Sequence, residues 1–400
     1  MDSQVLYNVL RQEIRERKIP ISLGKTCPVK CTFCYEKDHS YRPTIDVPMT
    51  TQEQWEFILR EIQSYPTRPN EAWLLGGNEY MEWTDLFLHP KAMDWLEEFL
   101  ETTDKKVIFF TVGYARVDRI QYLAEKYPGR IDYELSVITL GEARKKLMPH
   151  GPTVQQVLKM LDGPAVTSAN FYSFGPRTMS VDAQVISRVN PRCALWMGCL
   201  TPLKYIDAET SALMRYGRRF LAEEAQRIYD AGFPNMTQLH TESYITAWLN
   251  RKKILKTFDA CELDRNDWVV VSGNVYRILQ MFRKNRARYL YVPNATLGGD
   301  SDCTTLLTFR DIARRLNSQS MIYLPKVIMQ HPSGQERDIA GVTFDEFKTW
   351  FPRKRFRVLH KVNTLMSNNK LYEKGYIKNY VEDYVRNPLA KKFEQVPLPA

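Results

Sequence analysis

Short apolar segments that alternate with amphipathic segments constrain the fold of this chain more than any other feature. Strands that are apolar on both faces are typical of parallel sheets, and parallel neighbours need a crossover connection that is usually a helix. The candidate strands of the first half are 19–23, 71–75, 106–113, 133–138, 166–174 and 184–189. The pattern predicts an α/β fold whose six parallel strands form a partial or complete βα barrel.

Segments with helical spacing of apolar residues separate these strands. The candidate helices are 2–18, 51–65, 91–101, 117–126, 153–161 and 208–231. From about residue 256 a second α/β unit begins, with candidate strands at 268–272, 288–292 and 321–329 and candidate helices at 275–282, 306–316 and 343–351. We therefore predict a barrel domain at 1–255 with a leading helix in 1–18, an accessory α/β domain at 256–355 and a C-terminal extension at 356–400, loosely ordered from residue 370.

Three cysteines follow the first candidate strand at the spacing C-x3-C-x2-C. Cys27, Cys31 and Cys34 lie within eight residues, so their thiolates can converge on one [4Fe–4S] cluster, which normally takes four cysteine ligands. With three ligands, one iron is open to a substrate or cofactor. The alternatives are unrelated buried thiols and a zinc site, which needs a fourth ligand such as His39.

The cysteine spacing after a first strand, with Phe33 before the third cysteine, resembles the signature of the radical S-adenosylmethionine (radical SAM) superfamily. The resemblance implies that the cluster on Cys27, Cys31 and Cys34 binds S-adenosylmethionine through its open iron. It also implies that a flavodoxin or ferredoxin donates one electron to the cluster. That electron then cleaves the sulfonium of S-adenosylmethionine and gives a 5′-deoxyadenosyl radical. The likeness spans roughly residues 15–250.

The second candidate strand ends in Gly76 and Gly77, followed by Asn78 and Glu79. Glycine permits a positive φ and a close approach of the backbone to a ligand. The family has a Gly-Gly-Glu type motif here that contacts the amino group of S-adenosylmethionine. In this chain Asn78 stands where Glu is commonest, and Glu79 comes one residue later. An ordinary glycine turn is the alternative.

Polar residues also occur in and after the fourth candidate strand. Glu134 and Ser136 share one face of it, and buried polar side chains need partners. The resemblance implies that they contact the ribose and amino-acid parts of the cofactor. Arg144 follows the strand and can pair with the cofactor carboxylate, since a guanidinium grips a carboxylate bidentately. The alternative for Arg144 is a surface charge beside Lys145 and Lys146.

Four further cysteines, Cys193, Cys199, Cys261 and Cys303, are spread over the second half of the chain. They are candidates for an auxiliary iron–sulfur cluster. Their spacing matches no strong template, and four unrelated buried thiols are the alternative.

The second unit carries a resemblance of its own. Residues 269–273, 304–312 and 323–325, together with Asn294 and Gly298, look like an accessory domain that follows the barrel in an uncharacterised group of radical SAM iron–sulfur proteins. Members of that group usually have a PDZ-like segment in front, whereas only about 18 residues precede the first strand here. The methanogenesis-marker radical SAM proteins are a looser relative. Neither resemblance supplies the substrate.

Charge and cysteine usage bear on partners and compartment. The net charge is +10, which can indicate an RNA or acidic partner or can serve solubility. Seven cysteines, an odd number, argue against a secreted disulfide scaffold. We see no signal peptide and no apolar run of about 20 residues, so we expect a cytoplasmic protein without a membrane segment.

The first hypothesis from the sequence is a radical SAM enzyme, an oxidoreductase or transferase that modifies a peptide, an RNA or a cofactor precursor. A non-catalytic iron–sulfur electron carrier or scaffold is the second, although a carrier does not need the Gly76–Gly77 strand end or the polar pair Glu134 and Ser136. The third is a basic RNA-binding protein with a structural cluster, whose affinity would fall steeply with salt.

Overall fold

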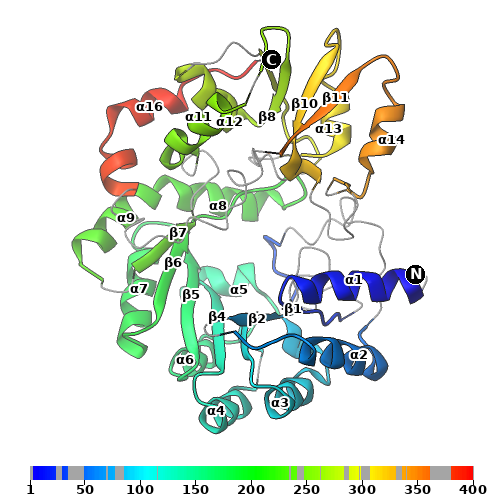
Figure 1. Ribbon diagram of the computed structural model, residues 1–400. Coiled ribbons are helices and arrows are strands. Elements are labelled where there is room, and N and C mark those ends of the chain that lie inside the picture. Colours follow the sequence, from blue (N-terminus) through cyan, green and yellow to red (C-terminus); the bar gives the residue numbers. More distant parts are fainter. Residues whose placement is uncertain are drawn as a thin grey trace. The chain divides into compact units, whose positions relative to one another are not determined.

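The computed structural model divides the chain into two compact units, each described here by itself (Figure 1). It describes residues 3–23, 29–34, 49–68, 71–76, 85–114, 116–233, 236–240, 247–261, 263–282, 288–296, 298, 307–329, 336–338, 340–360 and 380–399. The first unit comprises Met1–Lys37, Thr44–Met197 and Phe233–Met236. The second comprises Asp38–Pro43, Gly198–Gly232 and Thr237–Ala400.

The first unit contains a six-strand parallel sheet, which confirms the predicted α/β class. Its strands are β1 (Lys18–Ile19), β2 (Ala72–Leu75), β3 (Lys106–Thr111), β4 (Ile131–Ile138), β5 (Val166–Tyr172) and β6 (Ala194–Gly198). They lie in the sheet in the same order as in the sequence. Each strand therefore pairs with the next one along the chain, as repeated crossovers of one hand produce.

Helices of the first unit precede or connect these strands. They are α1 (Ser3–Arg15), α2 (Gln52–Gln63), α3 (Ala92–Thr102), α4 (Val117–Lys126), α5 (Ala143–Leu147), α6 (Val154–Leu161) and α7 (Thr178–Val189), with a 3-10 helix at Leu86–Leu88. Thr51 and Thr153 begin α2 and α6 with capping boxes, in which each threonine side chain accepts a backbone N–H three residues on. Such caps fix where the helices begin.

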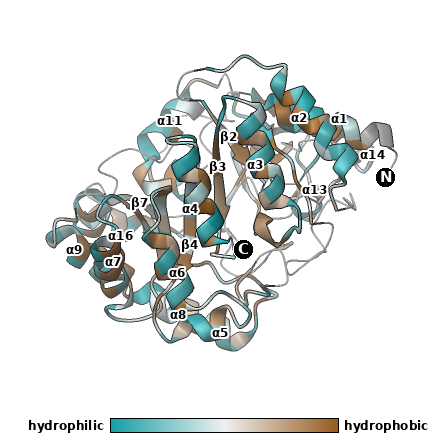
Figure 2. Cartoon of the chain, turned by 90° about the horizontal axis from the view of Figure 1, so that it is seen from below, coloured by the Kyte–Doolittle hydropathy of each residue, from teal (hydrophilic) through white to brown (hydrophobic). Residues whose placement is uncertain are grey.

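The two faces of the first sheet differ in exposure. Along β2, β3 and β4 every second residue is buried, and Tyr133 on this buried face donates its hydroxyl to Met160 O of α6. Figures 1 and 2 both place α3, α4 and α6 on one side of the strands. The other face carries half-exposed residues, among them Leu74, Ile108 and Phe110. The helices thus cover one face, and the second face is the more open one.

The second unit contains a four-strand parallel sheet in the order β11-β10-β8-β9. The strands are β8 (Trp268–Val271), β9 (Arg288–Tyr291), β10 (Met321–Pro325) and β11 (Arg355–Leu359). Phe309 and Phe347 stack in its core with ring centroids 4.5 Å apart. The helices here are α8 (Ala208–Arg219), α9 (Leu221–Asp230), α11 (Arg251–Asp259), α12 (Gly273–Met281), α13 (Phe309–Ala313), α14 (Phe344–Thr349) and α16 (Pro388–Glu394). The strand β7 (Met236–His240) does not belong to this sheet and follows β6 in the strand order of the first sheet.

Two predicted strands of the first unit are corrected. The strand expected at 19–23 is β1, which ends at Ile19 because Pro20 has no amide hydrogen to donate to a ladder. The strand expected at 184–189 is wrong, since this segment is the second half of helix α7. The sixth strand lies further on, at Ala194–Gly198.

Predicted elements of the second half are corrected in extent. The helix expected at 208–231 is interrupted at Phe220 into α8 and α9. The strand expected at 321–329 ends at Pro325, and a 3-10 helix occupies Lys326–Met329. The predicted extension contains most of β11 and, near its end, a π-helix at Tyr380–Val385 before α16. Within the described ranges we find no helix that is both long and apolar enough to span a membrane.

Candidate functional site

Cys31 and Cys34 occupy one tight turn. The backbone N–H of Cys34 donates to Cys31 O at 3.2 Å, and residues joined in this way have α-carbons within about 7 Å of each other. Both cysteines are half-buried. Val29, with 1% of its surface exposed, anchors the segment that leads into the turn. The turn therefore brings two of the three predicted ligands together, while Cys27 and His39 lie outside the described residues.

A backbone hydrogen bond attaches this turn to the chain that follows β4. The N–H of Thr32 donates to Leu147 O at 2.8 Å, and its hydroxyl lies 3.4 Å from the same oxygen. Leu147 ends helix α5, the first helix after β4. In a parallel sheet the carboxyl ends of all strands share one edge, so the loops after β1 and β4 meet at that edge.

Arg144 is a buried residue, with 4% of its surface exposed, and the surface-charge alternative is wrong. Its Nε donates to Pro152 O at 3.1 Å, and Nη1 donates to the carbonyls of Val137 and Thr139. Burial lowers the pKa of Arg144. Among the groups whose charge raises this pKa, the neighbouring Cys31 has the largest effect. Only Nη2 lacks a partner in the described part of the chain. Arg144 thus braces the end of β4 and keeps one N–H group available near Cys31.

The end of β4 that Arg144 holds has a strained backbone. Ile138 has a φ of 64°, a left-handed conformation that is rare for a β-branched residue. On its other side, the buried carboxylate of Asp182 in α7 accepts a hydrogen bond from Thr139 Oγ1 at 2.8 Å and one from Leu140 N at 3.2 Å. Arg144 and Asp182 together hold the chain in this conformation.

Gly76 is required at the end of β2. Its φ is 71°, and a Cβ there would lie 3.3 Å from Leu86 Cβ, so a larger residue would be both strained and crowded. Its N–H donates to Ile19 O at 3.0 Å, which sets the strand end beside β1. The other three residues of the predicted motif, Gly77, Asn78 and Glu79, lie outside the described residues.

Asp85 resumes the described chain after this motif, and sequence reasoning missed it. Its buried carboxylate accepts hydrogen bonds from Thr111 Oγ1 at 2.6 Å, Val112 N at 2.9 Å and Phe87 N at 3.1 Å. Burial raises the pKa of Asp85, although these hydrogen bonds lower it. The carboxylate fixes the end of β3 to the segment after β2. An Asp directly before the apolar run Leu86–Leu88 was the available signal, since Asp is a frequent N-cap.

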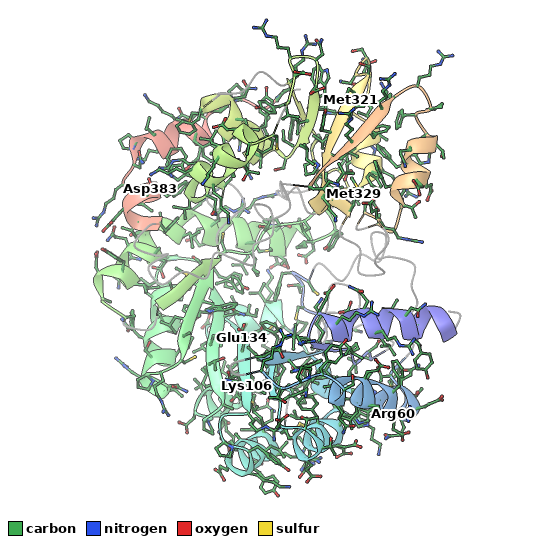
Figure 3. The ribbon with its side chains drawn as sticks, in the orientation of Figure 1. Arg60, Lys106, Glu134, Met321, Met329 and Asp383 are labelled. Atoms are coloured by element: carbon green, nitrogen blue, oxygen red, sulfur yellow. The ribbon has the colours of Figure 1, made fainter. Side chains whose placement is uncertain are left out.

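Glu134 lies on the more open face of the first sheet, yet only 8% of its surface is exposed. Burial raises the pKa of Glu134 to about 7. A side-chain hydrogen bond with Ser168 lowers this pKa, and the negative charge of Asp132 raises it. Figure 3 shows Glu134 on β4 and Lys106 at the start of β3, where Lys106 pairs with Asp132 at 2.6 Å. The predicted partner Ser136 is half-buried.

Ser168 and Asn170 of β5 complete this polar group, and sequence reasoning missed both. The sheet register places Ser168 opposite Glu134 and Asn170 opposite Ser136. Their signal was two polar residues at alternate positions of an otherwise mainly apolar strand, the same pattern that singled out Glu134 and Ser136.

The remaining cysteines behave as buried or internally bonded thiols. Burial raises the pKa of Cys193 and of Cys199 to about 12 each, whereas metal ligands are thiolates. Cys261 donates to Thr257 O at 3.3 Å. Among the described residues no three His, Cys, Asp or Glu side chains form a metal-binding group, but Cys27 and Cys303 lie outside them. The auxiliary cluster stays a prediction.

No family model matches this chain, and no curated protein matches it. The geometry of the site itself is therefore what bears on function.

Proposed function

We propose that this chain is a radical SAM enzyme whose first unit is a partial or complete βα barrel. The observation that carries the proposal is the hydrogen bond from Thr32 N to Leu147 O. It joins the loop after β1 to the helix after β4, although those strands are three places apart, about 14 Å in a flat sheet. A sheet that curves toward closure brings such loops together, and the cysteine turn then faces the carboxyl edge, where barrel enzymes have their active sites.

The residues described at this edge fit the cofactors that the cysteine spacing implies. Cys31 and Cys34, with Cys27, would hold the [4Fe–4S] cluster on their thiolates. Arg144 would donate its remaining Nη2 hydrogen bond to the carboxylate of S-adenosylmethionine, and its closeness to Cys31 supports this role. Gly76 would allow the cofactor's amino group to approach the backbone, with Gly77, Asn78 and Glu79 as further candidates.

When bound, the cluster and S-adenosylmethionine supply one-electron cleavage of a sulfonium to a 5′-deoxyadenosyl radical. The chain's own part is to bind and orient these groups and to exclude water from them. Ser136, half-buried and two residues from the end of β4, is the candidate for the ribose hydroxyls. A flavodoxin or ferredoxin is the proposed electron donor, in the cytoplasm, and the substrate is open among peptides, RNA and cofactor precursors.

Anaerobic reconstitution with iron and sulfide tests this proposal. We expect the reduced protein to convert S-adenosylmethionine to 5′-deoxyadenosine, measured by chromatography and mass spectrometry. Replacing Cys27, Cys31 and Cys34 by Ala should remove both the cluster absorbance and the product. The matched control is Cys261→Ala, which removes a thiol bonded to Thr257 outside the motif and should keep both. An intact, reduced cluster that yields no 5′-deoxyadenosine would contradict the proposal.

A further inference from the structure

Three polar residues are buried on the more open face of the first sheet. Glu134, Ser168 and Asn170 have exposed fractions of 8%, 3% and 8%, whereas Ile108 and Phe110 on the same face are half-exposed. Because side chains alternate along a strand, Glu134 and Ser136 point to one face of β4, and the paired residues Ser168 and Asn170 point to the same face of β5. The three residues thus form one polar group.

Two of these residues, Glu134 and Asn170, each have a buried polar atom without a hydrogen-bond partner in the described part of the chain. The atoms are Glu134 Oε2 and Asn170 Oδ1. Ser168 Oγ lies beside Glu134 and lowers its pKa through a side-chain hydrogen bond. Buried polar atoms are nearly always paired in folded proteins, because an unpaired one loses its bond to water and gains nothing in exchange. Two neighbouring exceptions on an open face indicate a site that a ligand completes.

The chemistry of the three atoms defines the ligand. A carboxylate oxygen and an amide oxygen only accept hydrogen bonds, and a serine hydroxyl can also accept one. No cationic side chain in the described ranges forms an ion pair with Glu134. The nearby Lys106 pairs instead with Asp132, at 2.6 Å. Arg144 donates to carbonyls at the strand end. The complement of this group is therefore a cation with several N–H donors.

We propose that Glu134, Ser168 and Asn170 bind a protonated amine of the substrate, an assignment that rests on the proposed radical SAM function. Glu134 lies three residues before Val137, whose carbonyl Arg144 holds, so the amine site is roughly 10 Å along the strand from the cofactor end. The cofactor and the substrate amine then occupy different levels of the same face. This assignment replaces the ribose role that the family resemblance implied for Glu134.

Amine binding at this site depends on pH through Glu134. The titratable groups around it are Asp132 on its own strand, whose charge raises the pKa of Glu134, and Lys106 on β3, which pairs with Asp132. The neighbouring strand β5 contributes only the neutral Ser168 and Asn170. The pKa of Glu134 is about 7. Affinity for an amine should therefore rise as pH increases through 7 and Glu134 becomes charged, as long as the amine keeps its proton.

Ligand-observed NMR on the full chain under anaerobic conditions tests the site directly. The probes are 1,4-diaminobutane and 1,4-butanediol, which have similar size and differ in charge. We expect the diamine to bind at pH 8, to bind at least tenfold more weakly at pH 5.5, and the diol not to bind. Glu134→Gln and Asn170→Ala should each weaken diamine binding at pH 8 by at least tenfold.

The matched control is Glu125→Gln, which removes an exposed carboxylate from α4 and should leave diamine binding unchanged. Circular dichroism verifies that each variant is folded. Equal binding of the diamine to wild type and to Glu134→Gln, or equal binding of diol and diamine, would overturn the proposal. Binding of S-adenosylmethionine, followed by the same method, separates the alternatives: if Glu134→Gln weakens only the cofactor, Glu134 contacts the ribose. Diamine binding needs no cofactor cleavage, so failure of the radical SAM function would show separately.

Discussion

At the scale of single residues, Glu134 couples folding to pH. Its pKa is raised from 4.5 to about 7 in the folded protein, chiefly because burial disfavours the charged carboxylate. Between these values the folded chain keeps a proton that the unfolded chain releases. The stabilising contribution is therefore fully present below pH 4.5 and is lost as pH rises through 7.

Glu134→Gln should remove this dependence, because an amide stays neutral at every pH. We expect the difference in unfolding free energy between the variant and wild type to shift by about 2–3 kcal/mol in favour of the variant from pH 5 to pH 8. Urea unfolding of both proteins at the two pH values measures it. Other groups whose pKa is raised by burial, such as Asp338, affect both proteins equally, so their effects cancel in the comparison. A difference that does not change with pH would mean that Glu134 is ionised in the folded protein throughout.

The sequence indicated several site residues by type and position, but not by environment. Arg144 was a candidate because it follows the fourth strand, yet burial decided between a functional and a surface role, and burial depends on the packing of α5. Ser168 and Asn170 carried only a weak signal, their polar alternation in β5, because their role depends on pairing with β4, about 34 residues away in the sequence. Residue type and spacing reveal a candidate, and tertiary packing gives it partners.

At the scale of elements, buried aspartates hold the strand ends that surround the site. Asp85 fixes the end of β3 through Thr111 and Val112, and Asp182 does the same for Thr139 and Leu140 after β4. Each carboxylate accepts several hydrogen bonds from residues at or just after the end of a strand. Loops held in this way can present ligand-binding groups with little loss of conformational freedom on binding.

Asp85→Asn should destabilise the protein by about 2–3 kcal/mol. The new NH₂ group would face N–H and O–H groups that now donate hydrogen bonds to Asp85, and a donor cannot accept them. Urea unfolding measures this loss, and faster hydrogen exchange at Val112 would locate it at the end of β3. Asp162→Asn is the control, since Asp162 is exposed after α6 and its replacement should change stability by less than about 0.5 kcal/mol. Equal effects of the two substitutions would show that the hydrogen bonds to Asp85 contribute nothing.

Most helices and strands of the first unit could be predicted because periodicity and capping residues act locally, as at Thr51 and Thr153. The failures have physical causes. Pro20 ended β1 early, and the β-branched residues of 184–189 suggested a strand. In α7, however, Met179, Ala183 and Ile186 recur at helical spacing on its buried side. Packing against the sheet outweighed the strand propensity of this segment.

At the scale of the whole molecule, the net positive charge comes from the second half of the chain. Residues 201–400 contain 32 Lys and Arg against 21 Asp and Glu, a net charge of +11, and residues 1–200 contain 24 against 25, a net charge of −1. Arg355 and Arg357 are exposed on β11, an edge strand of the second sheet. Attraction to polyanions should therefore arise from the second half and not from the cysteine turn.

Replacing Arg353, Arg355 and Arg357 together by Gln should weaken non-specific binding to single-stranded RNA. Loss of three phosphate contacts lowers the slope of log affinity against log salt by up to about 2. Filter binding of poly(U) at several salt concentrations measures the slope. The control replaces three exposed basic residues of the first unit, Arg60, Lys145 and Arg192, and should leave the slope unchanged. If the control lowers the slope as much, net charge alone governs the interaction.

The hydrogen bond between Thr32 and Leu147 has a consequence for biosynthesis. The two residues are 115 positions apart, so the ribosome makes Cys31 and Cys34 long before it makes the helix that holds their turn in place. A nascent chain that ends before residue 147 lacks this bond. Under the proposed function, iron–sulfur assembly factors would meet a completed turn only after β4 and α5 have emerged and docked. Delivery of the cluster is then a late event of maturation, and the cysteines need protection from oxidation until it occurs.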